Sequence, residues 1–254
     1  MIKKLMPLRY STYHCLENCI ANFCDAIGID HRPMFLYSWD FGFDNSMEAI
    51  GNKIHCYSSF DLVVEKYLDL AERFLGIKFD VFPNNFDYIN NYLKNDNLLM
   101  IQIDSYYVPW NLAYQKYHHF HFYFVFYNND LKCFSIVDSY CSNNIINVES
   151  IDVDIVERVY SLETPNDVLF NANIVSLRSL YREFLFNNMI NGVYDYISDF
   201  GNELLKIESV EDLVRDLSDF SNDVLIRRMS YISKSRFNTK IIFEYLGFME
   251  TNIS

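Results

Sequence analysis

The chain has 254 residues, of which 50% are hydrophobic and 17% aromatic, and its formal net charge is −13. Such a chain can bury a substantial core, so we expect one or two globular domains rather than a disordered or fibrous protein. The acidic balance argues against a nucleic-acid partner, because phosphate binding needs a basic surface. No uncharged apolar run reaches the roughly 18 residues that a membrane span needs, and the opening MIKKLMPLRYST lacks the apolar core of a secretory signal. We therefore expect a cytoplasmic protein without a membrane partner.

The six cysteines stand at positions 15, 19, 24, 56, 133 and 141 and form no CxxC pair. Three of them fall on one predicted helix, where the geometry of a disulfide is unfavourable. Free thiols in a reducing compartment are the simplest interpretation.

The first predicted helix carries Cys15 near its N-terminus. Ser11 or Thr12 can cap this helix, and Gly28 can end it in the left-handed conformation. The apolar residues that recur on one face at helical spacing are Leu16, Ile20, Phe23 and Ile27.

Two shorter helices and a group of strands are predicted next. One helix runs from about Asp61 to Phe74 and stops at Gly76, and the other covers Phe86 to Leu93. The pattern then changes to segments rich in β-branched and aromatic residues, with a turn at Asn128-Asn129-Asp130. These predicted strands cover residues 98–104, 119–127 and 132–138. An antiparallel hairpin beside another strand is therefore expected.

After Val175 the pattern is almost wholly helical. Apolar residues recur at spacings of three and four in three stretches that end near Leu185, Leu217 and Tyr245. We therefore predict an α+β fold with a mixed domain at residues 1–175, on which the candidates for catalysis described next all lie, and a helical subdomain at residues 176–254 packed on it.

Cys15 is the first candidate for chemistry. The positive end of a helix dipole favours thiolate over thiol, and a cysteine at a helix N-terminus lies in that field. Cys15 meets this condition, whereas Cys19 and Cys24 lie one and two turns further along. Considered alone, a cysteine on a helix is more often a small buried hydrophobe.

A nucleophilic thiol needs an acid/base partner, which in turn needs a carboxylate or amide to fix its tautomer. His121 lies near the start of one strand of the predicted hairpin and Asp138 at the end of the other, so antiparallel pairing brings them together. His119 shares a strand face with His121, whereas His118 points away. The residues alone predict a triad of Cys15, Asp138 and either His121 or His119.

A metal site is the alternative use of the histidine cluster. His118, His119 and His121 could hold zinc with a cysteine or with Asp104, because imidazole is a common zinc ligand. No paired-ligand spacing such as HExxH supports this alternative, so no metal is expected.

Four strings of the chain stand out together: YHCLEN (13–18), IQIDSYYVPW (101–110), HHFHFYFVFYNND (118–130) and FSIVDSY (134–140). In this order they resemble a known family, the N-terminal domain of the butirosin biosynthesis H protein and its bacterial relatives. The family is papain-like, and its motifs match His14-Cys15, Asp104-Ser105-Tyr106-Tyr107-Val108-Pro109, His121 and Asp138. The resemblance covers about half of the chain and implies a papain-like cysteine protease fold, with His121 rather than His119 as the catalytic histidine.

The resemblance implies an amide-forming acyltransferase. Members take an acyl or peptidyl group from a carrier-protein thioester and pass it to an amine during natural-product assembly. The partners implied are an acyl or peptidyl carrier protein and an amine acceptor, which can itself be carrier-bound. No cofactor is implied beyond the phosphopantetheine thioester that the carrier bears. The alternatives are a cysteine peptidase or amidase of the same fold, and a catalytically silent binding module.

The oxyanion donor departs from the papain-like pattern. Papain-like peptidases usually place a glutamine six residues before the nucleophile, and position 9 of this chain is arginine. The candidate donors are Arg9, Tyr10, Thr12 and the backbone N–H of Cys15.

Aromatic residues follow the predicted strand 98–104 and are candidates for the wall of a substrate pocket. They are Tyr106, Tyr107 and Trp110, with Asp104 beside them, and ordinary packing at the rim is the alternative role. Carrier proteins are commonly acidic, so a docking surface should be basic. The candidates for such a surface are Arg227, Arg228, Lys234, Arg236 and Lys240, and a solvated helix face is the alternative interpretation.

Overall fold

The computed structural model describes residues 5–38, 42–44, 46, 53–55, 64–164, 174–190, 193–205 and 224–248. The chain forms two compact units, one of residues 1–31 and 68–170 and the other of residues 32–67 and 171–254. The expected division into residues 1–175 and 176–254 stays a prediction.

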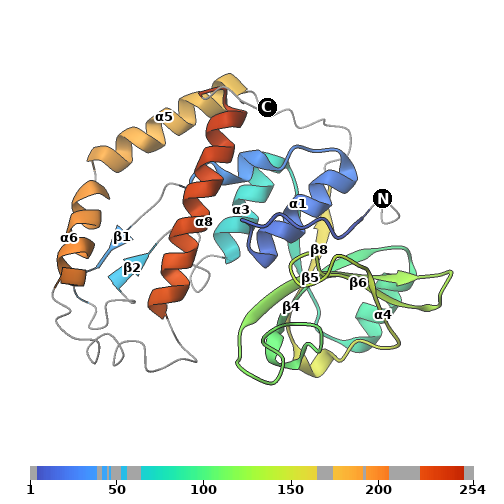
Figure 1. Ribbon diagram of the computed structural model, residues 1–254. Helices are drawn as coiled ribbons and strands as arrows, with labels where there is room; N and C mark the ends of the chain where they lie inside the picture. Colours follow the sequence, from blue (N-terminus) through green and yellow to red (C-terminus); the bar gives the residue numbers. More distant parts are fainter. Residues whose placement is uncertain are drawn as a thin grey trace. The chain divides into compact units, whose positions relative to one another are not determined.

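The first unit is built on a six-stranded sheet in the order β3-β8-β4-β5-β6-β7, in which all neighbours are antiparallel. Figure 1 shows this unit with β4, β5, β6 and β8 labelled. The mixed α+β class is therefore confirmed. The strands are β3 (Lys78–Phe82), β4 (Leu98–Asp104), β5 (Phe120–Asn128), β6 (Cys133–Val137), β7 (Ile146–Val148) and β8 (Val156–Glu163).

The central hairpin and its neighbouring strand lie where the sequence predicts them. Strand β5 pairs with β4 on one side, with His121 opposite Ile103, and with β6 on the other. The Asn128 side chain shapes the hairpin turn, because its oxygen accepts bonds from the backbone N–H groups of Asp130 and Leu131, both at 3.1 Å. His119 precedes the first residue of β5, so strand alternation does not fix the direction of its side chain.

Helices cover both faces of this sheet. Helix α1 (Cys15–Ile27) packs on β5, where the rings of Phe23 and Phe124 lie 6.0 Å apart. Helix α4 (Phe86–Lys94) buries Ile89 and Leu93 in a separate cluster with alternate residues of the central strands. Because side chains alternate along a strand, two apolar layers form with the sheet between them. Helix α3 (Val64–Leu75) ends before Gly76, close to the predicted position.

The start of α1 differs from the prediction. Its cap is His14, not Ser11 or Thr12, and the backbone N–H of His14 donates to Glu17 Oε2 at 2.7 Å in a capping box. The predicted end is confirmed, since Gly28 has a left-handed φ of 77°. Cys15 is therefore the first residue of the helix.

The second unit combines helices with a short two-stranded sheet, β1 (Gly42–Phe43) and β2 (Ile54–His55). Its helices are α5 (Ile174–Ile190), α6 (Val193–Leu205) and α8 (Val224–Tyr245), so the helical character expected after Val175 is confirmed where the chain is described. The helical stretch expected to end near Leu217 lies outside the described residues. None of the described helices combines the length and apolar character that crossing a bilayer would require.

Candidate active site

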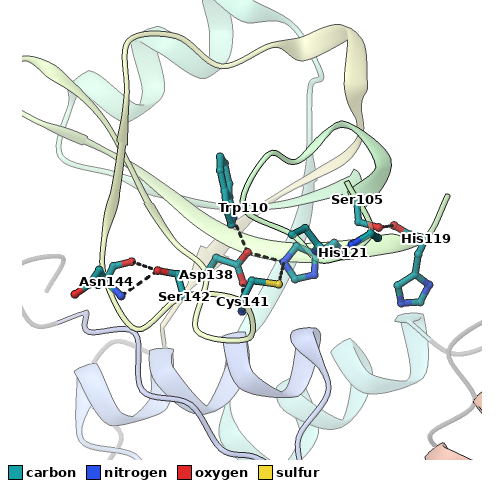
Figure 2. Close-up of polar contacts among 10 residues, drawn as sticks. Ser105, Trp110, His119, His121, Asp138, Cys141, Ser142 and Asn144 are labelled. Carbon is teal, nitrogen blue, oxygen red and sulfur yellow. Dashed lines mark hydrogen bonds and ion pairs between the residues drawn. The ribbon is translucent and has the colours of Figure 1, made fainter. Parts of the chain in front are cut away.

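The structure brings His121 and Asp138 into direct contact in the first unit. His121 Nε2 lies 2.7 Å from Asp138 Oδ2, and both side chains are buried, with exposed fractions of 2% and 0% (Figure 2). His121 belongs to β5, and Asp138 directly follows the neighbouring strand β6. The pairing of the two strands therefore holds the imidazole against the carboxylate.

Two further donors hold the Asp138 carboxylate in place. Trp110 Nε1 donates to Oδ2 at 2.9 Å, and the backbone N–H of Cys141 donates to Oδ1 at 3.1 Å. Burial alone would raise the pKa of Asp138, but the charge of His121 and these hydrogen bonds outweigh it and hold the pKa below its usual value. Asp138 is therefore a buried, oriented anion.

The same contacts favour a protonated His121. Burial alone would lower the pKa of the imidazole, but the charge of Asp138 and its hydrogen bond raise it well above its usual value, and hydrogen bonds to the Cys141 and Cys15 thiols add to the rise. The pair at rest is thus an imidazolium beside a carboxylate.

Cys15 completes the arrangement, because its thiol is hydrogen-bonded to His121. The side chain is 5% exposed and stands at the first position of α1, where the helix leaves backbone N–H groups without partners of its own. The thiol at the start of the helix therefore contacts the imidazole, and the imidazole contacts the carboxylate.

The other two cysteines of α1 have a different environment. Burial raises the pKa of Cys19 well above its usual value, and the charges of Cys15 and Asp138 add to that rise. Burial likewise raises the pKa of Cys24, with the charge of Asp25 as the next cause. These two thiols remain protonated at neutral pH and act as apolar core residues.

The rival histidine does not reach the carboxylate. Its backbone is held by Ser105, whose hydroxyl donates to the His119 carbonyl at 2.7 Å, and its ring is directed away from Asp138 (Figure 2). The third histidine of the cluster, His118, pairs with Asp104, with 2.5 Å between Nδ1 and Oδ2. Among the described residues, the three histidines are therefore not gathered around one point with Asp104, as the alternative metal site would require.

The candidate pocket residues divide between two places. Asp104 caps the short 3-10 helix Ser105–Tyr107 and contacts His118, and the Tyr106 ring stacks on the His118 ring with 4.4 Å between centroids. Tyr107 belongs to the same exposed group, its ring lying 5.1 Å from that of Tyr106. Trp110, in contrast, binds Asp138 and thus belongs to the triad environment.

Two asparagines of α1, which the sequence analysis did not single out, fix the segment that carries the oxyanion candidates. Asn22 exchanges hydrogen bonds with the backbone N–H and carbonyl of Leu8, both at 2.7 Å, and Asn18 Oδ1 accepts from the N–H of Tyr10 at 2.9 Å. Asn22 also donates to the Ser139 hydroxyl at 3.1 Å, next to Asp138. Their spacing of four residues, which places two amides on one helix face, was the available signal.

The three side chains considered as oxyanion donors lie in different places. The Arg9 guanidinium lies 5.7 Å from the centre of the Tyr140 ring, which in turn lies 6.1 Å from the His121 ring. The Tyr10 hydroxyl donates to Asp25 Oδ2 at 2.6 Å, near the far end of α1, so it does not reach Cys15. Thr12 lies in the turn before the helix and is half-buried.

The basic residues proposed for docking lie on α8 in the second unit. The side chains of Arg227 and Arg228 are outside the described part of the structure. Arg236 donates to the carbonyl of Ser38 at 3.4 Å, and Lys240 pairs with Glu244 at 3.7 Å. Lys234 stands two residues before Arg236, which is about 200° around a helix, so the two face opposite sides. Lys234, Arg236 and Lys240 therefore do not form one continuous basic face.

Comparison of the chain with protein-family models, with curated proteins and with solved structures gave no match.

Proposed function

We propose that this chain is a papain-like cysteine acyltransferase, which takes an acyl or peptidyl group from a carrier-protein thioester onto Cys15 and transfers it to an amine. The observation that carries the proposal is the line of contacts from the Cys15 thiol to His121 and from His121 to the buried carboxylate of Asp138. A cysteine at the start of a helix, served by a histidine and an aspartate on an antiparallel sheet, is the plan of papain-like enzymes. The resemblance of the four sequence strings supports transfer to an amine.

In the first half-reaction the Cys15 sulfur, as thiolate, attacks the thioester carbonyl and a new carbon–sulfur bond forms. The bond to the phosphopantetheine sulfur then breaks, and His121 donates its proton to that departing thiol. The raised pKa of His121 suits this role, because the imidazole enters the reaction protonated.

In the second half-reaction the amine attacks the acyl group on Cys15. His121, now neutral, takes a proton from the amine nitrogen, and Cys15 departs as the thiolate, which restores the starting pair. Thioester exchange is nearly isoenergetic and aminolysis is downhill, so the protein must supply orientation and exclusion of water rather than ATP.

Asp138 and Trp110 act on this cycle through His121. Asp138 Oδ2 accepts from the N–H at His121 Nε2, so the neutral ring keeps its proton on that nitrogen and presents Nδ1 as the atom that exchanges protons. The Trp110 bond to Oδ2 holds the carboxylate oxygen that contacts His121. Both are positioning residues.

The negative charge on the carbonyl oxygen needs donors near the Cys15 sulfur. The backbone N–H of Cys15, the first residue of α1, is one candidate donor. We assign the Arg9 side chain as the second donor. The hydrogen bonds that Asn18 and Asn22 make with residues 8–10 support this assignment. They hold the segment that carries Arg9 against α1, the helix that begins at Cys15.

The test is the intact mass of the protein after incubation with an acylated carrier protein. We expect an acyl adduct on the wild type, none on Cys15→Ala, and an undiminished adduct on the matched control Cys133→Ala, whose thiol is partly exposed on β6. Addition of an amine should discharge the adduct with formation of the amide. Adduct formation on Cys15→Ala would overturn the proposal.

The same experiment distinguishes the alternatives. Discharge by water at a rate that amines do not increase would identify a peptidase or amidase. Absence of an adduct, together with alkylation of Cys15 by iodoacetamide no faster than that of Cys19 or Cys24, would identify a catalytically silent binding module.

A further inference from the structure

Cys141 is a thiol beside the triad that the proposed reaction does not use. Its Sγ lies 3.9 Å from His121 Nε2, and its backbone N–H donates to Asp138 Oδ1 at 3.1 Å (Figure 2). His121 and Asp138 are buried, whereas Cys141 is partly exposed. Cys141 is therefore the member of this group that an ion from solvent meets first.

The three side chains present a zinc-binding set of donor atoms. One imidazole nitrogen, one carboxylate oxygen and one sulfur all lie within 4.8 Å of one another in the described part of the chain. Imidazole, thiolate and carboxylate are the three ligand types that zinc takes in proteins, and three protein ligands leave a fourth position for water or another donor.

The distances are close to those a bound ion would impose. With bond lengths of about 2.0–2.3 Å, tetrahedral zinc holds its ligand atoms about 3.3–3.6 Å apart. The Nε2–Oδ2 distance of 2.7 Å must open by about 0.6 Å and the Nε2–Sγ distance of 3.9 Å must close by about 0.3 Å to meet that range.

The surroundings already orient these ligands. The carboxylate of Asp138 is held by Trp110 Nε1 and by the Cys141 backbone N–H, in the way that outer hydrogen bonds hold metal ligands. The turn that carries Cys141 is closed by a bond of 2.8 Å from the Ser142 N–H to the Asp138 carbonyl. The sulfur is thus positioned by a short, hydrogen-bonded turn.

We propose that His121, Asp138 and Cys141 bind one zinc ion and that the bound ion switches off the acid/base function of His121. Binding displaces the protons of the Cys141 thiol and of His121 Nε2, which pass to solvent, and no oxidation or reduction occurs. An imidazole bound to metal through Nε2 carries its remaining proton on Nδ1 and has no free nitrogen lone pair, so it cannot take a proton from the attacking amine. The site goes beyond the proposed transfer reaction and does not depend on its substrates.

The experiment measures zinc binding to the whole chain after treatment with a chelator. Wild type, Cys141→Ala and the matched control Cys133→Ala are titrated with zinc chloride by calorimetry, and retained zinc is measured by elemental analysis. A parallel titration with cobalt chloride reports a cobalt–thiolate charge-transfer band. Circular dichroism of each variant checks that the fold is intact.

We expect wild type and Cys133→Ala to bind one equivalent and to show the cobalt–thiolate band. Cys141→Ala should bind at least tenfold more weakly and lack the band. Zinc should also slow the alkylation of Cys15 by iodoacetamide in the wild type but not in Cys141→Ala. Equal zinc affinity of wild type and Cys141→Ala, or no binding to the wild type, would refute the site. Because these readouts require no acyl donor, the zinc site and the transfer reaction can fail independently.

Discussion

Replacement of Asp138 by asparagine tests the central contact of the candidate site while keeping the size of the side chain. The two carboxylate oxygens of Asp138 accept from three donors, His121 Nε2, Trp110 Nε1 and the backbone N–H of Cys141. Asparagine offers only one acceptor oxygen, and its amide NH₂ is itself a donor. In either orientation of the amide, at least one buried donor therefore faces another donor.

The expected cost follows from these contacts. A buried donor left without a partner costs about 1–3 kcal/mol, and breaking a buried ion pair by removing one charge costs about 3–5 kcal/mol in total. We expect Asp138→Asn to lower the free energy of unfolding by about 3 kcal/mol or more, which is a large share of the roughly 5–15 kcal/mol of a typical domain.

The assay is urea unfolding near pH 6, followed by circular dichroism. Asp80→Asn is the control, because Asp80 pairs with Lys78 on the surface and its loss should leave the midpoint almost unchanged. The pKa of His121, followed by NMR, should also fall in Asp138→Asn, since the charge of Asp138 raises it. A destabilisation below about 1 kcal/mol, or an unchanged His121 pKa, would show that the buried pair does not form as described.

Four further predictions use the same contacts. The His121–Asp138 pair should contribute its full stabilisation between pH 3.8 and 6.5, the ordinary pKa values of the two groups. This stabilisation should be lost as pH falls through the lowered pKa of Asp138 or rises through the raised pKa of His121. Urea midpoints of wild type and Asp138→Asn across this pH range measure the loss. Trp110→Phe should cost about 1.5–3 kcal/mol in thermal unfolding, because it removes a hydrogen bond to a charged oxygen. Gly28→Ala should lower the free energy of unfolding by about 1–2 kcal/mol through strain at positive φ. No steric clash adds to this cost, because the new Cβ meets no neighbour within 4 Å. Arg9→Ala should slow acylation by about 10–1,000-fold with little change in unfolding, and an unchanged rate would remove Arg9 from the oxyanion site.

The elements that depend on local pattern were predictable from the sequence. Strand β4 matches the predicted range 98–104, and β5 and β6 differ from prediction by a residue at their ends. The strands β3, β7 and β8 were not predicted, because segments such as Lys78–Phe82 are half exposed and lack a continuous apolar run. Their place in the sheet depends on pairing with distant residues, which no local period reveals.

The N-terminus of α1 shows why a cap is hard to predict from residue type alone. Ser11 and Thr12 are favourable caps by composition, but the helix begins later, at Cys15. A capping box between His14 and Glu17 replaces them, and Glu17 at the third helical position was the signal for it. The correction moves Cys15 from near the helix start to its first residue, where the field of the helix dipole is strongest.

The parts of the site that the sequence did not reveal are contacts between loops and distant helices. Trp110 was interpreted as a pocket wall, yet its indole N–H reaches a carboxylate 28 residues later. Asn22 meets Ser139 across 117 residues, and Cys141 approaches His121 because of the turn after β6. Each depends on a loop conformation that tertiary packing selects, so hydrophobic periodicity carries no information about it.

The burial of the pair, rather than its mere proximity, determines how the site can work. If His121 were neutral, the Asp138 carboxylate, which is 0% exposed, would be a buried anion without a counter-charge. The imidazolium removes that penalty, which is why the pKa of His121 is raised despite burial that opposes it. In the proposed reaction the resting histidine is thus an acid, suited to protonating a departing thiol, and it becomes a base only after that proton has left. A donor with a poor leaving group should therefore depend on His121 more steeply than a thioester does, and comparison of acylation rates in His121→Gln with the two kinds of donor measures that difference.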